Sequence, residues 1–409
     1  MPSHTTHNTP ALRFPGYTGV WEQHQLNDYC GQLSATLDPQ KTPNSIFAEY
    51  SMPAFDNGEI PNIVTGDTMN STRKILDRSC LLINKLNVRK KRIWLVDKPE
   101  DNAVSSAEFI PIYSDEISLK FLKYSVSNES FTTYLEECSS GSSNSQKRIT
   151  PDVLMSAKLS FPSRREQDAI GQLMTVLDGL INLHQRQTQK LTKLKTGLLQ
   201  NMFPREGESV PRLRFPGFTT TWKQQKLGDI ATIVGGGTPA TTHSEYWNGT
   251  IDWYAPAEIT NQRYVSHSQR QITQLGLEKS SAQLLPAHKT VLFTSRAGIG
   301  KMAILQREAA TNQGFQSLVL HDGIDPYFIY SMNAILKKKA EKIAAGSTFL
   351  EISGSHLAHI RITIPSLSEQ KQIGSFFRTL DDRIHCHEQY TVKLVELKKG
   401  LLQKMFPQD

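Results

Sequence analysis

Two stretches of this 409-residue chain are copies of each other, and an internal repeat constrains architecture more than any other sequence feature. Residues 161–204 contain the motifs P-x-x-x-E-Q-x-x-I-G and G-L-L-Q-x-M-F-P, and residues 364–407 repeat both in register. The phrase L-R-F-P-G-x-T-x-x-W, which begins at Leu12, returns at Leu213. Each half of the chain therefore has a shared opening, a middle of its own and a shared close.

The two middles, residues 30–160 and 230–360, do not match in sequence. Both contain short β-branched runs separated by Gly, Pro and Asn, which indicate strands and loops. Helices are expected near residues 119–124 and 327–343. Because the openings and closes of the two halves match and the middles do not, we expect two α+β domains of similar fold. Each would have about 150 residues, which is an ordinary domain size.

The shared closes are expected to be long helices, because their apolar residues recur at steps of three and four, the spacing of a coiled-coil seam. A seam of about 36 residues, or roughly 54 Å at 1.5 Å per residue, must be buried against a partner. The expected seam residues are Ile170, Leu173, Leu177, Leu180, Leu191, Leu194 and Leu198 in the first copy, and Ile373, Phe376, Leu380, Leu394, Leu397 and Leu401 in the second.

Two equivalent repeats in one chain favour a pseudo-twofold arrangement, by analogy with the isologous contacts of dimers. The two helices are therefore expected to run antiparallel and to form a coiled coil. Polar residues interrupt the seam at matched positions, His184 and Gln187 in the first copy and His387 and Tyr390 in the second. They either fix the register of the helix pair or face solvent where the helices diverge.

The repeat pattern predicts a first recognition domain at 1–160, a central helical spacer at 161–204, a second recognition domain at 205–363 and a C-terminal helical spacer at 364–409. Two domains separated by helices of this length are a spacing device. Half-sites one turn apart on DNA are about 34 Å from centre to centre, within reach of such a spacer. Because the middles differ, a DNA target would be bipartite and asymmetric, with an unread spacer.

Bulk composition sets weaker limits. The net charge of +7 and the pI near 9.0 fit a polyanionic partner such as nucleic acid, although the excess is modest. The four cysteines are scattered and form no C-x-x-C pair, which suits a reducing compartment. The sequence begins without a signal-peptide pattern and has no apolar run long enough for a membrane helix, so a cytoplasmic protein without membrane association is expected.

The closing motifs resemble the specificity subunits of type I restriction–modification systems, and so do Gly-Gly-Gly-Thr-Pro at 235–239, Arg-Ala-Gly-Ile-Gly-Lys at 296–301 and Thr-Asn-Gln-Gly-Phe at 311–315. The resemblance extends from Leu12 to Pro407. It implies a non-catalytic DNA-binding subunit with two target recognition domains separated by the helices. The first middle departs from the family pattern, because it has neither the Gly-Gly-x-Thr-Pro turn nor the Asn-Gln-Gly segment.

The resemblance also implies partners and cofactors. Members of this family bind double-stranded DNA and assemble with two modification subunits, which methylate adenine using S-adenosylmethionine. They also assemble with restriction subunits, which translocate and cut DNA using ATP and Mg. This chain itself is expected to bind no cofactor, and its helix length is expected to set the spacer of the recognised site.

A basic cluster in the first middle contains the candidate DNA contacts Lys85, Arg89, Lys90, Lys91 and Arg92. Cations that neutralise phosphates provide salt-dependent affinity for DNA. Arginine can also read guanine O6 and N7 in the major groove. The alternative is a solvated strand edge whose charges prevent association with other strands.

In the second middle the candidate DNA contacts are Thr238, Arg296, Lys301, Asn312 and Gln313. The amides of the last two can pair with adenine N6 and N7. The alternative is that they are buried loop amides. The glycines of both motifs are expected to serve turn geometry, because glycine lets the backbone turn sharply and approach a ligand closely.

Catalytic and metal-binding patterns are incomplete. The His356-x-x-His359 pair and the His-Cys-His triplet at 385–387 lack a second ligand pair, so no metal site is expected. A nuclease-like Glu-x-Lys at 396–398 lies on the expected helix, and the Pro-Pro dipeptide of amino-methyltransferase loops does not occur. Two rival functions stay open, namely a stand-alone DNA-modifying enzyme and a coiled-coil adaptor that binds only proteins.

Overall fold

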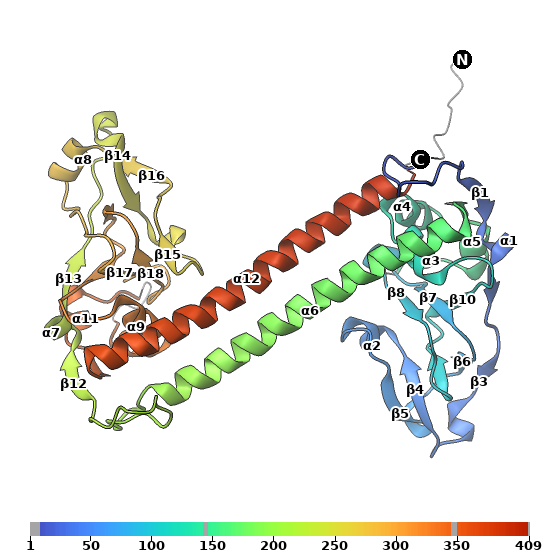
Figure 1. Ribbon diagram of the computed structural model, residues 1–409, viewed down its shortest axis with the longest axis horizontal. Helices are drawn as coiled ribbons and strands as arrows, with labels where there is room; N and C mark the ends of the chain where they lie inside the picture. The colour runs from blue at the N-terminus through green and yellow to red at the C-terminus, as the bar shows by residue number, and fades with distance from the viewer. Residues whose placement is uncertain (1–8, 142–145, 345–349, 408–409) are drawn as a thin grey trace. The chain divides into compact units, whose positions relative to one another are not determined.

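The computed structural model is a mixed helix-and-sheet protein (Figure 1). It describes residues 9–141, 146–344 and 350–407. The predicted α+β fold class is confirmed. Within these ranges, no helix is long and apolar enough to cross a membrane.

The chain forms two compact units, each with its own core. Unit 1 consists of Met1–Gln185 with Gln389–Asp409, and unit 2 consists of Arg186–Glu388. Both long helices cross from one unit to the other in sequence, so each unit contains pieces of both. The predicted sequential division into four segments stays a prediction.

Unit 1 begins with the shared opening and contains the first middle. Its elements are β1 (Glu22–Gln25), α1 (Leu26–Tyr29), β2 (Gly31–Gln32), β3 (Thr36–Leu37), η1 (Pro39–Lys41), β4 (Ile46–Tyr50), α2 (Met52–Asp56), β5 (Asn62–Thr65), η2 (Gly66–Thr68), β6 (Arg73–Ile75), β7 (Cys80–Asn84), η3 (Val88–Lys90), β8 (Ile93–Val96), β9 (Ala103–Ser105), β10 (Phe109–Tyr113), α3 (Leu119–Ser125), α4 (Glu129–Glu137), α5 (Pro151–Ser156), β11 (Lys158–Phe161) and the first part of α6 (Arg164–Met202). The helix expected near residues 119–124 is confirmed as α3.

Two main sheets pack on each other in unit 1. One has the strand order β2-β10-β7-β8 and the other β3-β6-β9-β4-β5, in which β4 and β9 pair in parallel. Their facing sides bury Leu82, Trp94 and Phe109 from the first sheet against Tyr50 and Leu76 from the second. The buried strands are rich in β-branched and aromatic residues, which suit a pleated surface covered by a second sheet.

Unit 2 has a similar arrangement of sheets and helices, built from a different sequence. Its elements are the last part of α6, β12 (Lys223–Lys226), α7 (Leu227–Ile230), β13 (Ala231–Gly235), η4 (Ser244–Tyr246), β14 (Trp247–Tyr254), η5 (Pro256–Glu258), β15 (Tyr264–Val265), β16 (Arg270–Ile272), α8 (Gln274–Glu278), β17 (Thr290–Phe293), β18 (Met302–Leu305), β19 (Ala309–Thr311), β20 (Gln316–Leu320), α9 (Pro326–Ser331), α10 (Asn333–Ile343), α11 (Gly354–Ala358), β21 (Arg361–Ile364) and the first part of α12 (Leu367–Met405). The helical region expected at 327–343 is two helices, α9 and α10, which meet at Met332.

The sheets of the two units correspond. The order β13-β20-β17-β18 matches β2-β10-β7-β8, and the order β19-β14-β16 matches β9-β4-β5, with β14 and β19 again parallel. Unit 1 has two additional strands, β3 and β6, beside β9, whereas unit 2 has β15 beside β18. The two middles are therefore domains of similar fold, as the matched frames predict.

The repeated motifs build the same frame in both units. In unit 1, β1 pairs with β11, and the buried Glu166 carboxylate accepts two hydrogen bonds from Arg13, at 2.8 and 2.6 Å. In unit 2, β12 pairs with β21, and Glu369 accepts two bonds from Arg214, at 2.6 and 2.7 Å. The Glu-Gln motif and the L-R-F-P-G opening recur because they supply the two sides of this bidentate ion pair.

The Met-Phe end of each long helix fills the core of the unit that carries the other repeat's middle. In unit 1, the ring of Phe406 lies 5.5 Å from that of Phe121 and 6.1 Å from that of Trp21. In unit 2, Phe203 is equally close to the aromatic core, 5.5 Å from Phe328. Both helix-end phenylalanines are buried, which explains why the Met-Phe-Pro close is repeated.

Within unit 1, α6 and α12 run antiparallel. The Asp178 carboxylate pairs with the amine of Lys398, and the ring of His184 stacks on that of Tyr390 at 5.1 Å. Residue numbers therefore rise along one helix as they fall along the other. His184 is half-buried, so it lies at the contact between the helices rather than in open solvent.

Within unit 2 the helices are also antiparallel. The amine of Lys195 lies 2.6 Å from the carboxylate of Asp381, and Phe203 at the end of α6 stacks on Phe377 near the start of α12. The antiparallel direction predicted from the repeat is confirmed in each unit. His387, like its counterpart in the first copy, is half-buried.

Part of the expected seam is wrong in register. Leu194 and Leu397 are 52% and 50% exposed, and Leu180 is also exposed. The positions at seven-residue intervals from Ile170 face inward, as expected. The second inward position of each heptad, its companion, lies four residues after the first, not three. The inward companions are Met174, Ile181, Thr188 and Lys195 in α6, and Phe377, Ile384, Thr391 and Lys398 in α12.

The other expected seam positions hold to different degrees. Sequence periodicity favours the wrong companions, because leucines stand at the expected positions Leu173, Leu180 and Leu194, whereas the inward positions of α6 include Thr188 and Lys195. The residues Ile170, Leu177, Ile373 and Leu380 are fully buried, and Leu173, Leu191, Leu198, Phe376, Leu394 and Leu401 are partly buried against the cores.

The four cysteines are free and differ in environment. Burial raises the pKa of the Cys30 thiol to about 11 and that of Cys80 to about 12, whereas Cys138 and Cys386 are exposed. Because the thiolate is the nucleophile, brief iodoacetamide treatment of the native protein at pH 8 should alkylate Cys138 and Cys386 and spare the other two. Peptide mass spectrometry measures this, and equal labelling of all four in native protein would contradict the burial described here.

Candidate nucleic-acid interface

Two loops of unit 2 bring candidate DNA contacts together. The first, residues 294–301, joins β17 to β18, and the second, residues 312–315, joins β19 to β20. The amide of Ser295 donates to the carbonyl of Gly314 at 2.8 Å. This bond holds Arg296 of the first loop beside the Asn-Gln-Gly segment of the second.

The Gly-Gly-Gly-Thr-Pro turn, residues 235–239, packs on the second loop. The hydroxyl of Thr238 donates to Oε1 of Gln313. A Cβ atom on Gly236 would lie 2.0 Å from the carbonyl oxygen of Asn312, so the close approach requires glycine. Two motifs that are far apart in sequence therefore form one surface.

The two loop amides are oriented by these contacts. Oδ1 of Asn312 accepts from the amide of Gly314 at 2.8 Å, and Oε1 of Gln313 accepts from Thr238. Asn312 is half-buried and Gln313 is exposed. Since each side-chain oxygen already accepts a hydrogen bond, the NH₂ groups are well suited to donate to base acceptors such as guanine O6 and N7 or adenine N7.

The cations Arg296 and Lys301 stand at the two ends of a tightly wound turn. The backbone is left-handed at Ala297, Gly298 and Gly300, with φ of 53°, 100° and 84°. Glycine adopts this conformation without strain, which accounts for the two glycines. Both cations are half-buried, and neither forms an ion pair with a residue that the structure describes.

Unit 1 has the same two loops, although its sequence does not indicate them. Residues 85–92 join β7 to β8, and residues 106–108 join β9 to β10. The basic cluster of unit 1 therefore occupies the place of the Arg296–Lys301 turn. Three backbone hydrogen bonds match, each from an amide to a carbonyl oxygen. In unit 1 they run from Lys85 to Glu108, from Asn84 to Arg92 and from Ser106 to Tyr50. Their counterparts in unit 2 run from Ser295 to Gly314, from Thr294 to Lys301 and from Asn312 to Tyr254.

Carboxylates from elsewhere in unit 1 offset much of the charge of the basic cluster. Arg89 pairs with Glu136, Lys91 with Glu129 at 2.7 Å, and Arg92 with Asp56 at 2.7 Å. The Arg92 guanidinium lowers the pKa of the Asp56 carboxyl through its hydrogen bonds. Among the described residues, Lys85 and Lys90 are the members of the cluster without an ion pair.

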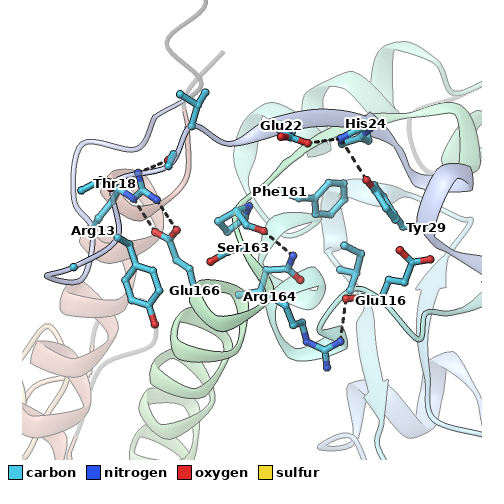
Figure 2. Close-up of a pocket in the computed structure, with 17 residues that line it drawn as sticks. Arg13, Thr18, Glu22, His24, Tyr29, Glu116, Phe161, Ser163, Arg164 and Glu166 are labelled. Atoms are coloured by element: carbon cyan, nitrogen blue, oxygen red, sulfur yellow. Dashed lines mark hydrogen bonds and ion pairs between the residues drawn. The ribbon is translucent and has the colours of Figure 1, made fainter.

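A pocket of about 560 Å³ lies at the start of α6 in unit 1 (Figure 2). Its polar groups contact one another, since Glu166 is held by Arg13, and His24 lies 3.3 Å from Glu22 and 3.5 Å from Tyr29. These contacts make the pocket part of the repeated frame rather than an active site. In the described ranges, no group of three or more His, Cys, Asp or Glu is placed to hold a metal ion.

The fold and the matched loops define a class of protein, one with two domains of similar fold whose equivalent loops carry different side chains. Residues 219–395 match the family described as type I restriction modification DNA specificity domain. This chain is therefore similar to the specificity subunits of type I restriction enzymes, as its repeated motifs predict.

Individual relatives agree with this family. The MjaIX specificity subunit of Methanocaldococcus jannaschii is 33% identical over 189 residues, which cover 45% of this chain and 44% of that protein. The HindI specificity subunit of Haemophilus influenzae is 21% identical over 462 residues, covering 94% and 98%. The solved S subunit from M. genitalium has the same fold, with a TM-score of 0.65 at 17% identity, covering 98% of this chain and 100% of that one.

Proposed function

We propose that this chain recognises a bipartite, asymmetric target in double-stranded DNA, with one half-site read by each unit. The observation that carries the proposal is the pair of equivalent loop clusters, which have the same backbone contacts and different side chains. Unit 2 offers the amides of Asn312 and Gln313 beside Arg296, whereas unit 1 has Ser106 and Ala107 at the places of the two amides and the basic cluster in the adjacent loop. Unlike donors at equivalent places would select unlike bases.

The chain would act as a scaffold as well as a reader. In this proposal it binds two modification subunits, which use S-adenosylmethionine, and restriction subunits, which use ATP and Mg. This chain itself would bind none of these cofactors. The names of its relatives as specificity subunits of restriction enzymes support this role, and the protein would act in the cytoplasm beside the host DNA.

Selection from random duplexes tests the reading function. The full chain, with its modification subunits, should enrich two unlike motifs separated by a gap of fixed length. A single contiguous motif would contradict one half-site per unit. Failure to retain any duplex at low salt, with binding to modification subunits intact, would instead favour an adaptor that binds only proteins.

The two long helices would set the gap between the half-sites. Seven residues inserted after Gln185 and seven after Glu388, where unit 1 and unit 2 meet in sequence, keep the heptad phase of both helices. At 1.5 Å per residue each insertion adds about 10 Å, so the preferred gap should grow by about three base pairs. Repeating the duplex selection measures the gap, and an unchanged gap would show that the helices are not the ruler.

A further inference from the structure

In each unit a helix packs against the loop that carries candidate cations, and the two helices have opposite charge. In unit 1 this helix is α4, which follows α3, and its sequence has three carboxylates and no lysine or arginine. In unit 2 it is α10, which follows α9, and its sequence has four lysines and one carboxylate. The same place in the fold is therefore acidic in one unit and basic in the other.

The start of α10 is fixed to the turn between Arg296 and Lys301. Nδ2 of Asn333 donates to the carbonyl oxygen of Gly300 at 2.8 Å. A Cβ atom on Gly300 would lie 2.7 Å from Cβ of Lys337, so the absence of a side chain lets the helix lie directly on the turn. A duplex bound at the two cations of the turn would therefore also pass α10.

The four lysines of α10 differ in what they contact. The amine of Lys339 donates to the carbonyl oxygen of Arg361 at 2.6 Å, and the amine of Lys342 lies 3.8 Å from a carboxylate oxygen of Glu206. These two lysines hold α10 to its own unit. Lys338, by contrast, is exposed and forms no hydrogen bond or ion pair with any residue that the structure describes.

Lys337 has only a weak partner, which lies on its own helix. Its amine is 3.9 Å from a carboxylate oxygen of Glu341, and both side chains are about half exposed. An exposed ion pair of this kind contributes little to stability, and salt screens it further. The helix dipole favours Lys342 in the last turn, but it does not account for Lys337 and Lys338 in the middle of the helix. The fold itself therefore does not require these two cations.

We infer that Lys337 and Lys338 bind phosphates of the DNA backbone beside the half-site at unit 2. This inference rests on the proposed function. A duplex whose bases face the adjacent loops presents phosphates on either side of them, and lysine is a flexible point charge suited to such anions. Phosphate contacts position a protein on DNA, and base contacts specify the sequence. In this division α10 holds the duplex while Asn312 and Gln313 face the bases.

Unit 1 is not expected to hold DNA in the same way. Glu129 and Glu136 of α4 pair with Lys91 and Arg89 of the adjacent loop. A helix with carboxylates repels phosphates, so α4 does not take the part of α10. The salt-dependent part of the affinity should therefore come more from unit 2 than from unit 1.

The salt dependence of binding tests the inference. On the duplex selected by the full chain, Lys337→Gln and Lys338→Gln should each make the slope of log K against log[salt] shallower by about 0.9, the value for one phosphate contact. The loss of affinity should be the same for every base variant of the half-site. Lys289→Gln is the matched control. Lys289 is exposed before β17, at the end of that strand far from loop 294–301, so its slope should not change.

Two results would overturn the inference while the proposed function stands. One is an unchanged slope in either α10 variant, although the protein still selects its bipartite duplex. The other is weaker assembly with the modification subunits at an unchanged slope, measured by native mass spectrometry, which would make α10 a contact for protein. Lys338→Arg should keep the wild-type slope, because it keeps the positive charge, and a slope as shallow as that of Lys338→Gln would reject the phosphate contact.

Binding to random duplexes separates the inference from the proposed function. If the wild-type protein retains random duplexes at low salt but enriches no bipartite motif, the reading function fails. The phosphate contacts would then still make the slope for random duplexes shallower by about 0.9 in Lys338→Gln, and an unchanged slope there would reject the inference as well. Both lysines are exposed, so each variant should melt at the wild-type temperature, which shows that any change in slope does not come from unfolding.

Discussion

Replacing Phe406 by alanine should destabilise unit 1 by about 3–5 kcal/mol, the usual cost of deleting a buried phenylalanine. Its ring is 2% exposed and packs on Phe121 and Trp21. The cavity would open under α3, so hydrogen exchange of α3 should accelerate first. Urea unfolding followed by hydrogen-exchange mass spectrometry measures both the free energy and the place of the loss.

Phe203→Ala is the matched control, because Phe203 has the same role in unit 2. It should accelerate exchange in α9 and leave α3 protected. If Phe406→Ala instead accelerated exchange in both units equally, the two cores would not be separate units of stability. If it changed neither, the helix end would not be part of the core of unit 1.

Replacing Arg13 by alanine should also cost about 3–5 kcal/mol, because it leaves the Glu166 carboxylate buried without its cation. The Glu166 side chain is 1% exposed, and Arg13 supplies two hydrogen bonds to it. The double variant Arg13→Ala with Glu166→Gln removes the buried charge and should recover at least about 1 kcal/mol of the loss. Chemical denaturation of the three proteins completes the cycle.

Arg214 and Glu369 provide the same cycle in unit 2. The two cycles should give similar coupling energies, because the geometry of the two ion pairs is the same. A double variant as unstable as the single Arg13→Ala protein would mean that lost packing of the arginine, rather than the stranded charge, accounts for the destabilisation.

The parts of the fold that repeat in sequence were predictable, and the reason is physical. A duplicated frame must satisfy the same contacts twice, so Arg13 with Glu166 and Arg214 with Glu369 recur together. The seam register was only half predictable. Leucines mark the expected positions Leu180 and Leu194, whereas the inward companion in the second half of α6 is Lys195, whose amine reaches a carboxylate on the other helix.

The candidate site was predictable where a motif exists. Thr238, Asn312 and Gln313 lie together, and the family motifs had already singled them out. The pairing of the basic cluster was not predictable, since its carboxylates come from residues distant in sequence.

The exchange of helix ends has a consequence for a single repeat. The core around Trp21 is completed by Phe406, which belongs to the other repeat, and the core around Trp222 is completed by Phe203. One repeat by itself therefore contains a core that its own last turn does not complete. It would need a second copy to supply the missing phenylalanine, and this chain holds both copies in one covalent molecule.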